Sequence, residues 1–180
     1  DHPTMPYGHD LDAMARKINT ATKLVFIANP NNPTGTWLDA DELEAFIKSV
    51  DQNVLVVLDE AYYEYMPDDL QPNTDQWLQQ YPNLIVTRTF SKIYGLAGLR
   101  IGYAVSHPDV ADVLNRVRQP FNTNMPAQAA ALAALEDRGH LGRSVQMNTI
   151  GLNQLADGFQ HLGLNFITSI GNFMTVDMGG

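Results

Sequence analysis

The sequence contains no cysteine, which excludes disulfide bonds and thiolate chemistry. Basic residues are also scarce: 11 lysines and arginines stand against 20 aspartates and glutamates, so the formal net charge is -9. No run of lysine and arginine offers a surface for the phosphates of a nucleic acid or for an anionic membrane. Neither nucleic acid nor membrane is therefore an expected partner.

Long apolar segments are missing as well. No window approaches the roughly 20 apolar residues that a helix needs to span a bilayer, and no charged segment followed by a short apolar stretch marks a signal peptide. We therefore expect a cytoplasmic protein. The five histidines, at positions 2, 9, 107, 140 and 161, lack the spacing of metal ligands, so no metal site is expected.

The chain does have enough apolar residues for a core, since 44% of its 180 residues are hydrophobic. Short apolar runs at 23–28, 53–58, 84–86 and 99–105 predict strands, and segments with helical periodicity lie between and after them. Strands that alternate with helices are typical of βαβ units. This order predicts an α/β fold of three layers, αβα, with a mostly parallel sheet.

Several segments have the pattern of helices. Asp39, followed three residues later by Glu42, has the form of a capping box, and the residues after it form one apolar face. An amphipathic helix is predicted at 109–119 and an alanine-rich helix at 127–137. A longer helix is predicted at 141–162, although three glycines within it weaken that pattern.

A change of composition near 122–126 is the best candidate for a domain boundary. We expect residues 1–124 to form the central part of a large domain. Residues 125–180 would then form an interdomain helix and the start of a small α+β domain, in which 166–176 begins another strand.

Polar residues follow three of the predicted strands. The turn-rich segment NPNNPTG (29–35) follows the first strand, Asp59 follows the second, and Ser91 and Lys92 follow the third. In an open parallel sheet, ligands bind outside the carboxyl ends of the strands. These three groups of residues are therefore expected to converge on one edge of the sheet.

Two of these residues carry charges that are costly at an apolar sheet edge. The Asp59 carboxylate follows an apolar run, so it needs a positive partner if it is buried. The Lys92 amine has the converse problem, because an amine in such a place tends to lose its proton and become a nucleophile. Taken alone, each also fits an ordinary role, Asp59 as a helix cap and Lys92 as a lysine whose charge reaches solvent.

Ser91 and Arg100 have the chemistry to bind a phosphate, one as a hydroxyl donor and the other as a forked cation. A turn serine and a surface ion pair would explain them equally well one by one, and 29–35 could be only a tight loop. The order NPNNPTG, DEAY, SK and GLR along one chain is much more informative than any of its parts.

These motifs resemble a known family. NPNNPTG (29–35), DEAYYEY (59–65) and RTFSKIYGLAGLR (88–100) are similar to the signature motifs of the fold-type I pyridoxal-phosphate-dependent aminotransferases, class I/II. The resemblance covers essentially the whole chain. Within the family, the pattern SK-x-x-GLAGLR-x-GY and the segment VRQPFNTN (117–124) are most similar to the histidinol-phosphate aminotransferase subgroup. The chain looks like a central fragment of such an enzyme.

The resemblance implies three catalytic residues. Lys92 would be joined to the cofactor, pyridoxal 5'-phosphate, and would carry a proton between the substrate's α-carbon and the cofactor. Asp59 would pair with the pyridine nitrogen and keep it protonated. Tyr62 would hydrogen-bond the 3'-oxygen of the cofactor.

The resemblance also implies further cofactor-binding residues. Asn32 would share the 3'-oxygen with Tyr62, while Ser91 and Arg100 would bind the cofactor phosphate. The partners would be a small-molecule amino donor and 2-oxoglutarate, in a homodimer whose sites form between two subunits. Segments that complete the site in family members, such as a glycine-rich phosphate cradle, have no counterpart in this sequence.

The implied reaction is reversible amino transfer from L-histidinol phosphate to 2-oxoglutarate, a step of histidine biosynthesis, with the fragment itself inactive. Threonine-phosphate decarboxylases and aromatic or branched-chain aminotransferases share several of these motifs and remain alternatives. Two further alternatives are a non-catalytic phosphate-binding module, in which Lys92 is only an electrostatic contact, and a structural fragment that folds without a ligand.

Overall fold

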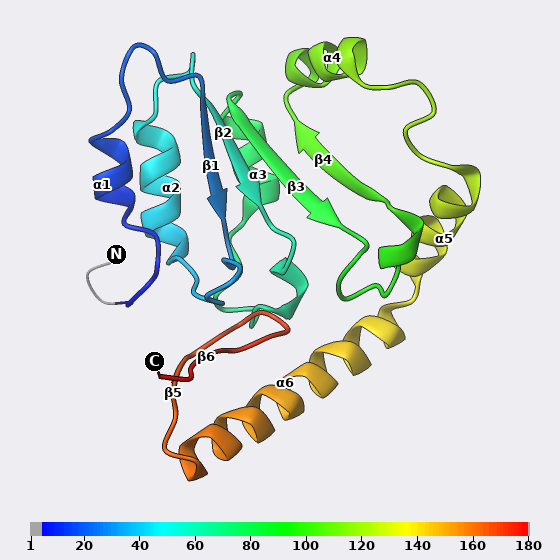
Figure 1. Ribbon diagram of the computed structural model, residues 1–180. Coiled ribbons are helices and arrows are strands. Elements are labelled where there is room, and N and C mark those ends of the chain that lie inside the picture. Colours follow the sequence, from blue (N-terminus) through cyan, green and yellow to red (C-terminus); the bar gives the residue numbers. More distant parts are fainter. Residues whose placement is uncertain (1–4, 180) are drawn as a thin grey trace.

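A four-stranded sheet organises the computed structural model, which describes residues 5–179 (Figure 1). Strands β1 (Leu24–Ala28), β2 (Leu55–Asp59) and β3 (Leu84–Thr89) are parallel neighbours, and β4 (Gly102–Ser106) lies antiparallel beside β3. Each predicted apolar run overlaps one of these strands. The α/β class with a mostly parallel sheet is therefore confirmed.

The fourth strand starts later than predicted because 3₁₀ helix η2 (Ala97–Leu99) occupies the beginning of that apolar run. No α-helix crosses over between β3 and β4. The chain instead turns back on itself, and a return of this kind pairs the strands antiparallel.

Three helices cover one face of the sheet: α1 (Leu11–Ala15), α2 (Ala40–Ser49) and α3 (Thr74–Gln80). Alternate residues of the strands point to this face and pack against the helices in one buried apolar cluster. The strand members are Ile27, Val56, Leu58, Leu84 and Val86, and the helix members are Leu11, Leu43, Phe46, Ile47 and Trp77. Burial of this apolar surface is the main force that holds the layers together.

The predicted cap of α2 is present, since Asp39 Oδ1 accepts hydrogen bonds from the backbone N–H groups of Asp41 and Glu42. The short helix α1 was not among the predicted elements. Asp10 caps its start, since Asp10 Oδ1 accepts from Ala13 N at 2.7 Å.

Three helices follow the sheet: α4 (Pro108–Val117), α5 (Met125–Glu136) and α6 (Arg138–His161). Helix α6 is continuous through its glycines, because each glycine costs only about 1 kcal/mol relative to alanine and the Asp137 side chain caps the helix at its start. No helix within residues 5–179 is long and apolar enough to cross a membrane.

The last predicted strand is instead a hairpin of two short strands, β5 (Asn165–Ile167) and β6 (Thr175–Asp177), which pair antiparallel. The intervening residues include Ser169, Gly171 and Asn172, which favour turns and interrupt the strand. In Figure 1 this red hairpin lies below the sheet, next to the loops that leave β1 and β2. The proposed division at residues 124 and 125 stays a prediction.

Two hydrogen bonds attach this C-terminal segment to the loop after β1. Ile170 N donates to Gly35 O at 3.0 Å, and Thr175 Oγ1 donates to Pro33 O. Gly35 has φ +74°, and a Cβ atom placed there would lie 2.0 Å from Ser169 Oγ and 2.8 Å from Ser169 Cα. Only glycine combines this backbone conformation with so close an approach.

We expect Gly35→Ala to loosen this attachment and to destabilise the folded chain by roughly 3 kcal/mol, the sum of a left-handed backbone cost and steric overlap. Gly163→Ala is the matched control, since Gly163 also has positive φ but open space around it, and it should cost about 1 kcal/mol. Urea unfolding of both variants measures the difference. Equal losses in the two variants would contradict the role of the Ser169 contact.

Candidate active site

The carboxyl ends of the three parallel strands meet at one edge of the sheet (Figure 1). The register pairs Ala28 with Asp59 and Asp59 with Thr87, so all three strands end at nearly the same level. NPNNPTG, DEAYYEY and the loop with Ser91 and Lys92 all leave from this edge. The predicted convergence of the three motifs is therefore found.

Tyr62 is the residue on which the motifs meet. Asn32 Nδ2 donates a hydrogen bond to Tyr62 Oη at 2.8 Å. Lys92 Nζ lies 5.3 Å from the centre of the Tyr62 ring, within the range of a cation–π contact. Since Tyr62 Oη accepts from Asn32, its own proton remains available for a further acceptor. Three segments that are far apart in sequence thus form one cluster, which we call the Tyr62 cluster.

Phe173 joins the Tyr62 cluster from the C-terminal hairpin. Its ring centre is 5.3 Å from that of Tyr62, with an angle of 78° between the planes, which is a favourable edge-to-face arrangement. Sequence analysis did not single out Phe173. In the sequence Phe173 simply follows the turn of the hairpin, and this position does not predict its contact with Tyr62.

Asp59 is the last residue of β2, and its side chain is exposed. Asp59 Oδ1 accepts from Ala61 N at 3.1 Å, which makes it a local cap of the turn. Because the carboxylate is not buried in the described chain, it does not need a positive partner there. Leu55, Val57 and Asp59 alternate with the core residues of β2 and point to the face that α1, α2 and α3 do not cover.

The buried carboxylate is that of the next residue, Glu60, which has no exposed surface. Arg88 Nη2 and Nε lie 2.7 and 2.8 Å from Glu60 Oε2. Thr74 Oγ1 also donates to this oxygen, at 3.4 Å, and the Arg88 guanidinium lies 3.9 Å from the centre of the Tyr63 ring. The pair joins the end of β2 to β3 directly beside Asp59.

Burial raises the pKa of Glu60 to about 7, and Arg88 acts against this shift. The other carboxyl oxygen, Oε1, is buried without a hydrogen-bond partner, which agrees with a strong desolvation of the group. Partial burial would lower the pKa of Arg88, but Glu60 raises it above its usual value, so the guanidinium stays charged.

The two predicted phosphate ligands are less closely tied to the Tyr62 cluster. Ser91 is half-buried, and its backbone N donates to Thr89 Oγ1 at 3.0 Å. Arg100 is exposed with φ +53°, and its Nη1 donates to Ala97 O at 2.8 Å. Within residues 5–179 no hydrogen bond joins Arg100 to Ser91. Their shared role in binding a phosphate stays a prediction.

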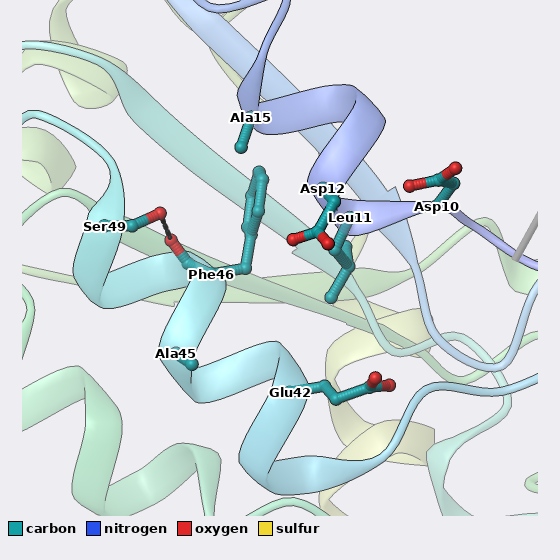
Figure 2. Close-up of a pocket in the computed structure, with 8 residues that line it drawn as sticks. All are labelled: Asp10, Leu11, Asp12, Ala15, Glu42, Ala45, Phe46 and Ser49. Carbon is teal, nitrogen blue, oxygen red and sulfur yellow. Dashed lines mark hydrogen bonds between the residues drawn. The ribbon is translucent and has the colours of Figure 1, made fainter. Parts of the chain in front are cut away.

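The pocket drawn in Figure 2 lies between α1 and α2, away from the Tyr62 cluster, and has a volume of about 290 Å³. Asp10, Asp12 and Glu42 contribute carboxyl groups to its wall, and Phe46 forms its apolar side. A second pocket of about 430 Å³ lies between α6 and the hairpin. It is closer to the cluster, because Tyr65 lines it and the Tyr65 ring lies 6.4 Å from that of Tyr62.

Comparison with known proteins identifies the class of protein. The chain belongs to the aminotransferase class I and II family, whose family model matches residues 3–179. The resemblance to fold-type I aminotransferases that the motifs indicated is thereby confirmed.

Individual proteins similar to this chain include histidinol-phosphate aminotransferases. The chain is 60% identical to histidinol-phosphate aminotransferase 1 of Nitrosococcus oceani over 98% of this chain and 48% of that protein. It is also 60% identical to histidinol-phosphate aminotransferase 1 of Cupriavidus pinatubonensis, over 96% of this chain and 46% of that protein. The chain thus spans about half the length of the curated relatives it matches.

Solved structures agree with this comparison. The histidinol-phosphate aminotransferase of Sinorhizobium meliloti in complex with pyridoxal-5'-phosphate superposes with a TM-score of 0.88 at 37% identity, covering 96% of this chain and 47% of that one. An aspartate aminotransferase of Thermus thermophilus with maleate has a TM-score of 0.76 at 25% identity, covering 92% and 45%. The fold is therefore shared beyond a single subgroup of the family.

We expect Glu60 to make the stability of the fold depend on pH. Its pKa is 4.5 in the unfolded chain and about 7 in the folded one, so the folded state binds the proton more tightly. This contribution to stability is complete below pH 4.5 and is lost as the pH rises towards 7, with a total change of roughly 3 kcal/mol.

Urea unfolding of the wild-type chain and of Glu60→Gln at these two pH values measures the effect. The wild type should lose stability relative to Glu60→Gln as the pH rises, because glutamine keeps the neutral form. Asp69→Asn, at an exposed carboxylate, is the control and should show no such trend. A wild-type chain that gains stability relative to Glu60→Gln over this interval would contradict the raised pKa.

Proposed function

We propose that this chain provides the cofactor-binding centre of a pyridoxal-phosphate-dependent aminotransferase that acts on L-histidinol phosphate and 2-oxoglutarate. The observation that carries the proposal is the Tyr62 cluster, in which Asn32, Tyr62 and Lys92 meet at the carboxyl edge of the parallel sheet. Ligand sites of open parallel sheets lie at this edge.

The residues at this edge fit pyridoxal phosphate by their chemistry. The cofactor needs an amine to join its aldehyde, an acid beside its ring nitrogen and donors for its ring oxygen. Lys92 is partly exposed and Asp59 is exposed, so both groups are accessible, and Tyr62 has a free phenolic proton. Ser91 and Arg100 add a hydroxyl and a guanidinium, which suit the phosphate.

Each residue then has a defined task. Lys92 Nζ would take a proton from the substrate's α-carbon and return it to the aldehyde carbon of the cofactor. The Asp59 carboxylate would hold a proton on the ring nitrogen, and the Asn32 and Tyr62 donors would fix the orientation of the ring. When bound, pyridoxal phosphate supplies the conjugated system that accepts electrons from the α-carbon.

The similar proteins support the choice of substrate, because histidinol-phosphate aminotransferases are among them at up to 60% identity. We also propose that the intact protein is a cytoplasmic homodimer. Residues 1–124 would belong to its large domain, and residues 125–180 would begin its small domain. The length of the relatives supports the placement of this chain within a longer protein, since each relative is about twice as long as the matched region.

Lys92 is expected to be the residue that joins the cofactor. Incubation with pyridoxal phosphate, borohydride reduction and peptide mapping by mass spectrometry should place the adduct on Lys92. The adduct should vanish in Lys92→Ala and persist in Lys48→Ala, which removes a lysine of helix α2. An adduct of equal yield in Lys92→Ala would show that the labelling is unspecific and would count against the site.

Asp59→Asn is expected to lower kcat/KM of the intact polypeptide roughly a hundredfold, because a neutral amide no longer stabilises the protonated ring. The assay follows glutamate formation from L-histidinol phosphate and 2-oxoglutarate, with Asp69→Asn as the exposed control.

The same assay tests the substrate. Threonine phosphate and an aromatic amino acid should be used far less efficiently than L-histidinol phosphate. Preferred turnover of either compound would leave the cofactor site in place and overturn the proposed substrate.

A further inference from the structure

A histidine of helix α6 contacts the loop that carries Lys92. His140 Nε2 lies 3.1 Å from the backbone carbonyl oxygen of Ile93, the residue directly after Lys92. The two residues are 47 positions apart in the sequence. Figure 1 shows the start of α6 beside the segment that connects β3 to β4. Ile93 lies in the motif RTFSKIYGLAGLR, whereas His140 belongs to no motif that the sequence analysis identified.

The contact determines whether the Nε2 atom of His140 carries a hydrogen. A carbonyl oxygen can only accept, so His140 Nε2 must carry the hydrogen. Ser144 Oγ, one helical turn further on, lies 3.3 Å from the same nitrogen and therefore acts as a second acceptor. The imidazole is thus held between its own helix and the loop.

The backbone of His140 is fixed at the same point. Asp137 Oδ1 accepts from His140 N at 2.9 Å and caps the helix. A residue in the first turn of a capped helix has little freedom, so its side chain is well placed to hold another segment.

The Lys92 loop has little else to hold this carbonyl group. Its own backbone bonds run from Gly95 N to Lys92 O and from Leu96 N to Phe90 O, both at 2.9 Å. Neither bond uses the oxygen of Ile93. The side chains of Phe90 and Ile93 are buried on either side of Lys92, so the loop is anchored by apolar contacts and by His140.

We propose that His140 is a positioning residue for Lys92: its Nε2–H holds the Ile93 carbonyl and so fixes the backbone from which the reactive amine extends. This inference rests on the proposed function of Lys92. It also means that α6, the helix that would join the two domains, is in direct contact with the catalytic loop. His140 touches neither substrate nor cofactor in this role.

Three variants of the intact polypeptide test the proposal. His140→Ala removes the donor, His140→Gln keeps an N–H at a similar reach, and His161→Ala changes an exposed histidine at the other end of α6. We expect His140→Ala to lower kcat roughly tenfold, with KM changed by less than about twofold, because the amine is misplaced while substrate binding is kept. His140→Gln should recover most of kcat, and His161→Ala should behave as the wild type.

Amide hydrogen exchange gives a readout that does not depend on activity. In His140→Ala the amides of Gly95 and Leu96 should exchange faster than in the wild type, and in His140→Gln they should be protected again. Faster exchange that is confined to this loop, together with the loss of kcat, supports the proposal. Unchanged kcat and exchange in His140→Ala would overturn it, and so would a loss of kcat that glutamine fails to restore.

The activities of the wild type and of His140→Ala together distinguish a failure of this inference from a failure of the proposed function. A wild-type polypeptide without pyridoxal-phosphate-dependent transamination refutes the function of Lys92, and with it the positioning role. An active wild type whose His140→Ala variant is equally active refutes only the role of His140.

Discussion

The parallel register of β1, β2 and β3 is the constraint on which the rest of the structure depends. It brings three strand ends to one level and sets which residues face the helices. A slip of one residue would exchange the faces of Asp59 and Glu60, so that the carboxylate now at the accessible edge would be buried and the one paired with Arg88 would be exposed. The core of α1, α2 and α3 opposes such a slip, because it would move Val56 and Leu58 out of the apolar cluster.

Much of the fold could be predicted because the sequence patterns that indicate its strands and helices lie within those elements or next to them. Apolar runs marked the strands, the Asp39 cap marked α2, and the motifs NPNNPTG, DEAY and SK marked the strand ends. The face to which a residue points was harder to predict: a continuous apolar run such as 54–58 has no alternation, so it did not show that Asp59 would be exposed and Glu60 buried. The β5–β6 hairpin was predicted as one strand because its turn residues lie between two short apolar segments.

The contacts around the candidate site could not be predicted for a different reason. Arg88 and Glu60, Phe173 and Tyr62, and His140 and Ile93 are pairs from separate elements, and nothing in the sequence near either member indicates the other. Once the register of β2 and β3 is known, the first pair follows, since Asp59 is opposite Thr87. The other two pairs depend on where α6 and the hairpin pack, which is a property of the whole chain.

Helix α6 has 24 residues and is therefore about 36 Å long. Its first turn touches the Lys92 loop, and the hairpin that follows its last turn is bonded to Gly35 in the loop of Asn32. The helix thus connects the two loops that contribute Lys92 and Asn32 to the Tyr62 cluster, one through its first turn and the other through the hairpin that follows it. A shift of α6 relative to the sheet would therefore act on both loops at once, so the relative position of Asn32 and Lys92 depends in part on a helix that contains neither.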